Sequence, residues 1–164
     1  MTNTKKTKDM VYAALFAAMI FLTTAYLFHL PAPNGGYIHL GDAFIYLAAC
    51  VLPRGYAALA SAVGAGLSDL ISPGGAPWVI PTVIIKSLMV LPFRKQGRFM
   101  TKSNFFATIV SGIGSTALYL IVEMLMFGNP IAVLMTIPHG MLQPIGSTIL
   151  FVLVAIALDK TKIN

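Results

Sequence analysis

The sequence predicts an all-α integral membrane protein, a six-transmembrane-helix bundle with both termini in the cytoplasm. Composition is the first observation behind this prediction: of 164 residues, 57% are hydrophobic and 10% are charged, and the mean hydropathy is +0.83. Soluble domains are about half apolar and about a quarter charged. A domain of this length buries only roughly 70% of the surface that its unfolded chain exposes, so much of the apolar remainder must face lipid.

The second observation is that Pro, Gly and charged residues divide the chain into six apolar segments. The first segment carries no charge from Met10 to Leu30, which is about 30 Å of helix and matches one hydrocarbon core. It is longer than the roughly 7 to 15 apolar residues of a signal peptide, so we expect a membrane span. We expect one membrane domain over residues 1–164, with spans at about 10–30, 40–53, 55–71, 77–93, 105–127 and 130–158.

Two of these segments have unusual lengths. The second has only eleven residues between Asp42 and Arg54, too few for a full crossing unless Asp42 lies near the interface or inside the protein. The sixth is overlong, and we expect Pro138 and Pro144 to kink it. The lone Cys50 is interpreted as a small buried hydrophobe.

The third observation is the distribution of Lys and Arg, which mark the cytoplasmic side of membrane proteins. With six spans and a cytoplasmic N-terminus, ten of the eleven basic residues fall on the cytoplasmic side. These ten are Lys5, Lys6, Lys8, Arg54, Arg94, Lys95, Arg98, Lys102, Lys160 and Lys162. The net charge of +6 therefore reflects topology and contact with anionic lipid, and we expect no nucleic-acid partner.

Lys86 is the one basic residue deep inside a predicted span. An ionisable group there costs at least roughly 2.5 to 3.5 kcal/mol, so it should face protein or water and have a partner. Counted from the outer ends of their helices, Lys86, Glu123 and His139 lie roughly 13, 7 and 15 Å deep. All three residues therefore occupy the outer half of the membrane, which predicts a common site.

Residues three or four apart on a helix share a face, and this extends each of the three positions into a polar stripe. The stripes are Trp78, Thr82 and Lys86, then Ser115 or Thr116 with Tyr119 and Glu123, then Thr136, His139, Gln143 and Ser147. We expect an outward-opening pocket in which a small polar ring compound stacks on Trp78 and Tyr119. The residues expected to hydrogen-bond its edge are Lys86, Glu123, His139 and Gln143. The structural alternative is that Lys86 and Glu123 form an ion pair while Trp78 anchors the chain at the interface.

The outer loop between the first two spans, residues 31–42, is rich in turn-forming residues. Gly35 and Gly36 permit the movement that a lid needs, although a tight connection between helices needs the same freedom. We expect the loop to cap the pocket, and the tight connection is the alternative. Its candidate ligand contacts are Asn34, Tyr37, His39 and Asp42.

Other site chemistries find little support in the sequence. The histidines and aspartates do not show the short fixed spacing of zinc ligands, so we expect no metal site. Asp69, at the outer end of the third span, is expected to bond the amides of the following loop more than a ligand. No Gly-x-x-x-x-Gly-Lys-[Ser/Thr] motif is present, so this chain does not bind ATP through a P-loop.

Small residues four apart on the first span permit the close approach of a second helix in lipid. They form two pairs, Ala13 with Ala17 and Ala14 with Ala18. The third span is also lined with small residues, so contact within the chain is one interpretation. The second interpretation is a surface on which a partner protein docks. The position of the alanines, toward the cytoplasmic end and away from the pocket, favours it.

The chain resembles, over essentially its whole length, the substrate-binding S components of energy-coupling factor (ECF) vitamin transporters. The motifs that carry the resemblance are the alanine stripe and, more specifically, His39-Leu-Gly-Asp-Ala-Phe-Ile-Tyr46, followed by Ser68-Asp69 and Gly-Gly-Ala-Pro-Trp78. The resemblance implies a vitamin-capture subunit of a prokaryotic plasma membrane, which docks through the stripe on an ECF transmembrane coupling protein carrying two ATPase subunits. ATP and Mg would be bound by those ATPases, so the chain itself would hold no cofactor and catalyse no reaction.

Within that family the sequence resembles the branch assigned to hydroxymethylpyrimidine or pyridoxine, with riboflavin members as relatives. Such a ring has one π-face, ring nitrogens and hydroxyls, which suit the aromatic and polar residues of the predicted pocket. Two other functions stay open. The first is a stand-alone secondary transporter or channel. The second is a membrane enzyme that uses Glu123 and His139 as acid and base.

Overall fold

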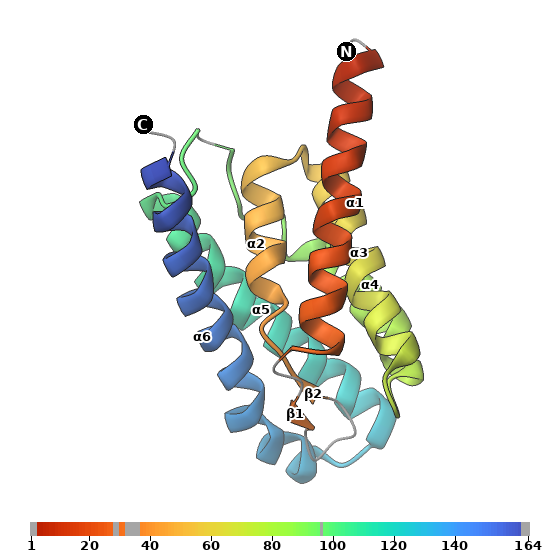
Figure 1. Ribbon diagram of the computed structural model, residues 1–164. Coiled ribbons are helices and arrows are strands. Elements are labelled where there is room, and N and C mark those ends of the chain that lie inside the picture. Colours follow the sequence, from red (N-terminus) through yellow and green to blue (C-terminus); the bar gives the residue numbers. More distant parts are fainter. Residues whose placement is uncertain (1–2, 28–29, 32–36, 96, 162–164) are drawn as a thin grey trace.

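The computed structural model describes residues 3–27, 30–31, 37–95 and 97–161, without the side chains of Ala132 and His139. Within these ranges the chain forms six α-helices (Figure 1), which are α1 (Asn3–Ala25), α2 (Asp42–Val51), α3 (Arg54–Ile71), α4 (Val79–Leu88), α5 (Lys102–Phe127) and α6 (Pro130–Thr161). A short 3-10 turn, η1 (Ala76–Trp78), precedes α4, and β1 (Leu30–Pro31) pairs antiparallel with β2 (Tyr37–Ile38). The predicted order of six helices is confirmed.

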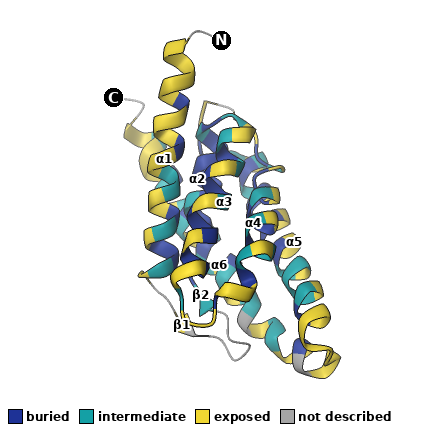
Figure 2. Ribbon diagram, turned by 90° about the vertical axis from the view of Figure 1, so that its right-hand side faces the viewer, coloured by how far each residue is buried: buried dark blue, intermediate teal, exposed yellow. Residues whose placement is uncertain are grey.

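Three of the described helices are long and apolar enough to cross a membrane. They are Asn3–Ala25, Lys102–Phe127 and the Val133–Thr161 part of α6. Between 22% and 28% of the apolar window in each of them is buried, and large side chains such as Leu15 and Leu153 are exposed. Figure 2 shows that exposed residues occupy much of α1. Apolar surface of this extent belongs in lipid. The chain is therefore a membrane protein, and a crossing by all six helices stays a prediction.

The first residues of α1 and the last residues of α6 lie at the same end of the molecule (Figure 1). Arg54 begins α3, Lys102 begins α5 and Lys160 is in the last turn of α6. This arrangement agrees with the charge distribution in the sequence, and the assignment of that end to the cytoplasm stays a prediction.

Helices α1 and α3 approach each other closely through small residues. A Cβ atom at Gly64 would lie 2.6 Å from the carbonyl oxygen of Ala17 and 2.8 Å from Cβ of Ile20, so only glycine fits there. Ala13 is buried and Ala17 is partly buried against the core, whereas Ala14 and Ala18 are both exposed. The two alanine pairs therefore face different directions: one packs inside the bundle, and the other lies on its surface.

Helix α2 forms the centre of the bundle. Every residue from Asp42 to Cys50 is buried except the partly buried Phe44, and α2 is dark blue over most of its length in Figure 2. The Tyr46 ring stacks on Phe93 with centroids 5.2 Å apart and meets the Phe151 ring edge-on. A helix of ten residues is about 15 Å long, half the thickness of the hydrocarbon core. Its shortness is thus explained by burial inside protein.

Helices α5 and α6 pack against each other at a glycine and a proline. Pro138 and Pro144 lie inside α6, which continues through both and curves toward the end of α5 in the half that carries them (Figure 1). A Cβ atom at Gly112 would lie 2.6 Å from Cβ of Pro144, so the two helices meet there at the closest distance that glycine permits. The Asp159 carboxylate accepts the backbone N–H groups of Phe99 and Met100, each at 2.8 Å, and fixes the other end of α6 to the segment before α5.

Candidate ligand-binding site

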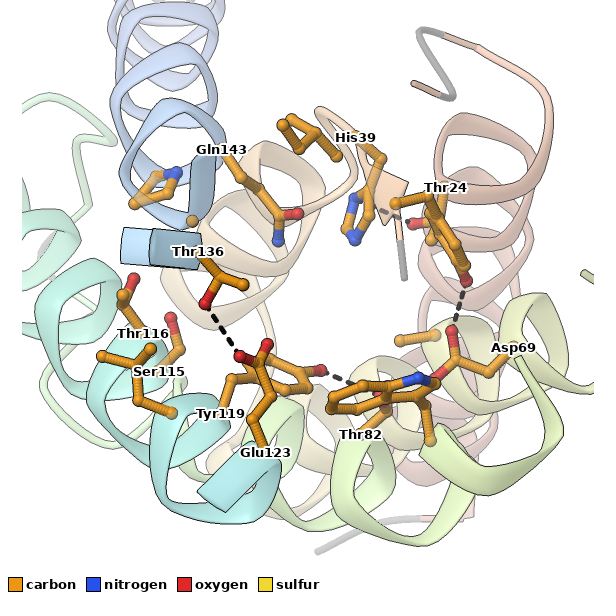
Figure 3. Close-up of a pocket in the computed structure, with 17 residues that line it drawn as sticks. Thr24, His39, Asp69, Thr82, Ser115, Thr116, Tyr119, Glu123, Thr136 and Gln143 are labelled. Carbon is orange, nitrogen blue, oxygen red and sulfur yellow. Dashed lines mark hydrogen bonds between the residues drawn. The ribbon is translucent and has the colours of Figure 1, made fainter. Parts of the chain in front are cut away.

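A cavity of about 110 Å³ lies between the last four helices, the end of α1 and the β2 segment (Figure 3). Its lining combines aromatic rings, hydroxyls, carboxylates and an amide. The residues are Thr24, Tyr37, Ile38, His39, Ala65, Asp69, Trp78, Thr82, Ser115, Thr116, Tyr119, Leu120, Glu123, Thr136, Gly140, Gln143 and Pro144. An apolar hollow with a few convergent polar groups is the usual form of a small-molecule site.

One wall of the cavity is aromatic. Trp78, at the end of η1, and Tyr119, on α5, have ring centroids 6.0 Å apart and an interplanar angle of 54°. The Tyr119 hydroxyl is fixed by a hydrogen bond of 2.8 Å with the Thr82 hydroxyl, one turn after Trp78 on the same side of the chain. The Tyr119 ring is therefore held in place beside Trp78, which suits stacking on a flat ligand.

A carboxylate lies opposite α6 near the end of α5. Glu123 is only 5% exposed and accepts a hydrogen bond of 2.8 Å from the Thr136 hydroxyl. The two residues face each other because Gly128, in the left-handed conformation at φ 63°, ends α5 and lets the chain turn directly into α6. The Glu123 carboxylate is a strong acceptor for a donor group of a ligand.

The segment before α2 forms another side of the cavity. The Tyr37 hydroxyl donates to Oδ1 of Asp69 at the end of α3; burial and the negative charge of Asp69 raise the pKa of Tyr37, so the phenol keeps its proton. Nδ1 of His39 accepts the backbone N–H of Gly41 at 3.1 Å, which places the proton of the neutral ring on Nε2. A side chain at Gly41 would collide with the Thr24 hydroxyl, so this turn packs directly on α1.

Behind Gln143 lies a buried ion pair. Nζ of Lys86 is 2.6 Å from Oδ1 of Asp42, and the two side chains are each 1% exposed. Nε2 of Gln143 donates to the other oxygen, Oδ2 of Asp42, at 2.8 Å. The interpretation that Lys86 pairs with Glu123 is therefore wrong. The reason is that α2 lies in the centre of the bundle and brings Asp42, its first residue, between α4 and α6.

The structure distributes the predicted site residues in three ways. Those that line the cavity are Tyr37, His39, Trp78, Thr82, Tyr119, Glu123 and Gln143. Asp42 and Lys86 lie behind the wall and do not line it. Asn34 and the side chain of His139 lie outside the described residues. Contact of any of these residues with a ligand stays a prediction.

Two polar residues of the lining belong neither to the predicted helix stripes nor to the predicted loop contacts. Asp69 was expected to bond the amides of the following loop, and this stays a prediction; the structure shows a hydrogen bond from the Tyr37 hydroxyl, in the segment between α1 and α2. Thr24 gave one signal in the sequence, because Thr23 and Thr24 are a polar pair after the apolar stretch from Met10 to Leu22. Hydroxyls of this kind commonly bond their own helix, as Thr23 does with the carbonyl of Met19, so the signal is weak.

Comparison with known proteins gives one family. The family model described as ECF-type riboflavin transporter, S component, matches residues 4–160. Comparisons with curated proteins and with solved structures give no match. Because the match covers nearly the whole chain, the protein belongs to the ECF-type riboflavin transporter S component family, whose members are substrate-binding subunits of membrane transporters and not enzymes.

Proposed function

We propose that this chain captures a vitamin or vitamin precursor with a single heteroaromatic ring, hydroxymethylpyrimidine or pyridoxine, from outside the cell for ATP-driven import. The observation that carries the proposal is the cavity itself, in which the Trp78 and Tyr119 rings face a set of hydrogen-bonding groups that includes Glu123 and Gln143. Stacking on one side and directional polar contacts on the other suit a ring with hydroxyl or amino substituents.

The size of the cavity supports a small ligand. A water-sized sphere needs about 10 to 15 Å³, and the cavity of about 110 Å³ is several times larger, so it has room for a substituted single ring. A pyrimidine or pyridine with its substituents is of this size. A three-ring flavin with its ribityl chain is more than twice as large.

Riboflavin is the second candidate because the matching family model is described by that vitamin. Its isoalloxazine ring would stack on the same aromatic wall, and its polar edge would meet the same acceptors.

Import by this chain requires partners, because its sequence contains no P-loop. We propose an ECF transmembrane coupling protein carrying two ATPase subunits, in a prokaryotic plasma membrane. The surface proposed for docking is the alanine stripe of α1. Ala14 and Ala18 lie on its outward side, while Ala13 and Ala17 let α1 lie close against α3.

The test is native mass spectrometry of small molecules that the purified chain retains, followed by calorimetry with hydroxymethylpyrimidine, pyridoxine and riboflavin. We expect one of the single-ring compounds to bind with the highest affinity. Preferential binding of riboflavin would establish the second candidate, and failure of all three to bind would reject the proposed substrate class. Uptake by the reconstituted chain without ATPase partners would instead identify a stand-alone transporter.

A further inference from the structure

The buried row of Lys86, Asp42 and Gln143 has a consequence for which ligands the cavity accepts. The geometry points to a positioning role for the Lys86–Asp42 ion pair: it orients the Gln143 amide so that the carbonyl oxygen Oε1 faces the cavity, and the site therefore selects ligands with an N–H or O–H donor at that point. The inference rests on the proposed function, since it concerns the ligand of the same cavity.

The orientation of the amide follows from the chemistry of the carboxylate. Asp42 is ionised beside the Lys86 ammonium 2.6 Å away, and an ionised carboxylate only accepts hydrogen bonds. Its Oδ1 receives Lys86, and its Oδ2 receives Nε2 of Gln143 at 2.8 Å. An amide turned by 180° would place its oxygen against a carboxylate oxygen, lone pair against lone pair. The hydrogen-bond network therefore determines that Nε2 of Gln143 points to Asp42 and that Oε1 points away from it.

The three residues come from three separate helices. Asp42 begins α2, Lys86 lies in the last turn of α4, and Gln143 lies on α6 directly before Pro144. Gln143 lines the cavity, whereas Asp42 and Lys86 do not. Figure 3 shows the Gln143 side chain reaching into the cavity toward His39, with its oxygen on that side. The ion pair thus acts on a ligand only through the glutamine.

A fixed acceptor discriminates between ligands more strongly than a rotating one. A donor group of the ligand can form a hydrogen bond with Oε1. An acceptor group at the same place cannot, because neither it nor Oε1 carries a proton to share. The 4-amino group of hydroxymethylpyrimidine, a ring hydroxyl of pyridoxine and the imide N–H of a flavin are all donors. The inference therefore predicts loss of affinity when that donor is replaced by a methyl group of similar size.

The binding test compares hydroxymethylpyrimidine with 2,4-dimethyl-5-hydroxymethylpyrimidine, in which a methyl group replaces the amino group. With the full chain in nanodiscs, we expect the amino compound to bind at least about tenfold more tightly. In Gln143→Met, which keeps the length of the side chain but lacks the acceptor, the two dissociation constants should become equal within about threefold. Thr82→Val is the matched control, because it changes the same cavity and should weaken both compounds while keeping their ratio.

The role of the ion pair is tested by the double variant Asp42→Asn, Lys86→Met, which removes both charges together. The amide that replaces the carboxylate can donate or accept, so it no longer fixes Gln143, and the ratio should fall while binding persists. A structural role alone would weaken both compounds equally. An unchanged ratio in Gln143→Met overturns the acceptor, and an unchanged ratio in the folded double variant overturns the positioning role.

A second measurement needs no ligand and no variant of the network. The sequence contains two glutamines, Gln96 and Gln143, so side-chain 15N labelling of glutamine gives two NH₂ signals, which Gln96→Asn assigns. We expect the Gln143 amide proton that is donated to Asp42 to be shifted downfield and to exchange with water at least about tenfold more slowly than the side-chain amide of a glutamine in a short peptide. Equal exchange rates would overturn the inference even if the vitamin binds. The expected spectrum together with no binding of any probe would reject the proposed function while leaving the orientation of Gln143 in place.

Discussion

The Tyr37 hydroxyl donates a hydrogen bond to Oδ1 of Asp69 and thereby joins the segment before α2 to the end of α3 (Figure 3). Both residues line the cavity, so the bond holds two of its sides together. The contact links parts of the chain 32 residues apart, and it depends on the phenol keeping its proton beside the carboxylate.

Removing the hydrogen bond between Tyr37 and Asp69 should weaken the contact between two walls of the cavity without changing the shape of the cavity. A hydrogen bond to a charged group contributes about 1.5 to 3 kcal/mol, so we expect hydroxymethylpyrimidine to dissociate at least about tenfold faster from Tyr37→Phe. Trp78 is the one tryptophan of the sequence and lines the cavity, so stopped-flow fluorescence reports the rate. Tyr56→Phe, in the first turn of α3, is the control. An unchanged rate in Tyr37→Phe would show that the bond does not hold the ligand in.

Trp78→Ala should weaken binding of hydroxymethylpyrimidine at least about tenfold, because the stacking face and its apolar area are lost together. Trp78→Phe keeps a ring and should recover most of the affinity. Isothermal titration calorimetry measures both. Equal affinities for the alanine and phenylalanine variants would mean that stacking contributes nothing.

Glu123→Ala should also weaken binding, by about 1.5 to 3 kcal/mol, since it removes a buried charged acceptor. Thr136→Val removes the hydroxyl that donates to Glu123 but keeps the carboxylate, so its effect should be smaller. Calorimetry on the two purified variants gives the comparison. Unchanged dissociation constants in both Trp78→Ala and Glu123→Ala would refute the assignment of the cavity as the ligand site.

Replacing Ala14 and Ala18 by Trp should abolish uptake by cells that contain the partner subunits and leave ligand binding intact. These alanines lie on the outward side of α1, and bulk at a close helix contact prevents docking. Leu15→Trp adds bulk at a neighbouring exposed position and should leave uptake normal. Equal loss of binding and uptake in Ala14→Trp, Ala18→Trp would indicate an internal packing role instead.

Lys86→Met alone should destabilise the protein, because it leaves the Asp42 carboxylate buried without its cation. Breaking a buried pair in this way costs about 3 to 5 kcal/mol. The double variant Asp42→Asn, Lys86→Met removes the uncompensated charge and should recover most of that loss. Thermal unfolding in one detergent compares the variants, and equal stability of Lys86→Met and the wild type would contradict the burial of the pair.

The helices of this protein are predictable from sequence because each is a run of apolar residues that ends at Pro, Gly or charge. The polar residues on α4, α5 and α6 were also found in this way, since their spacing of three or four puts them on one face. Trp78, Tyr119 and Glu123 accordingly line the same cavity. A helical period determines which residues share a face, whatever the neighbouring helices are.

Contacts between distant segments were not predictable in the same way. Lys86 and Asp42 are 44 residues apart, and Gln143 and Asp42 are 101 residues apart. Nothing in the local sequence of Lys86 distinguishes Asp42 from Glu123 as its partner, since the choice depends on which helix occupies the centre. Tyr37 and Asp69 likewise meet through irregular backbone, where no period assigns a direction to the side chains.

The central position of α2 constrains how the chain enters the membrane during synthesis. A segment about 15 Å long cannot hold itself across a bilayer, and its first residue carries a charge whose counter-ion is translated only later, on α4. Either charge alone would resist insertion by a few kcal/mol, whereas the joined pair is neutral. We therefore expect stable integration of α2 to depend on α4, so that the segment from Asp42 to Leu88 leaves the translocon together.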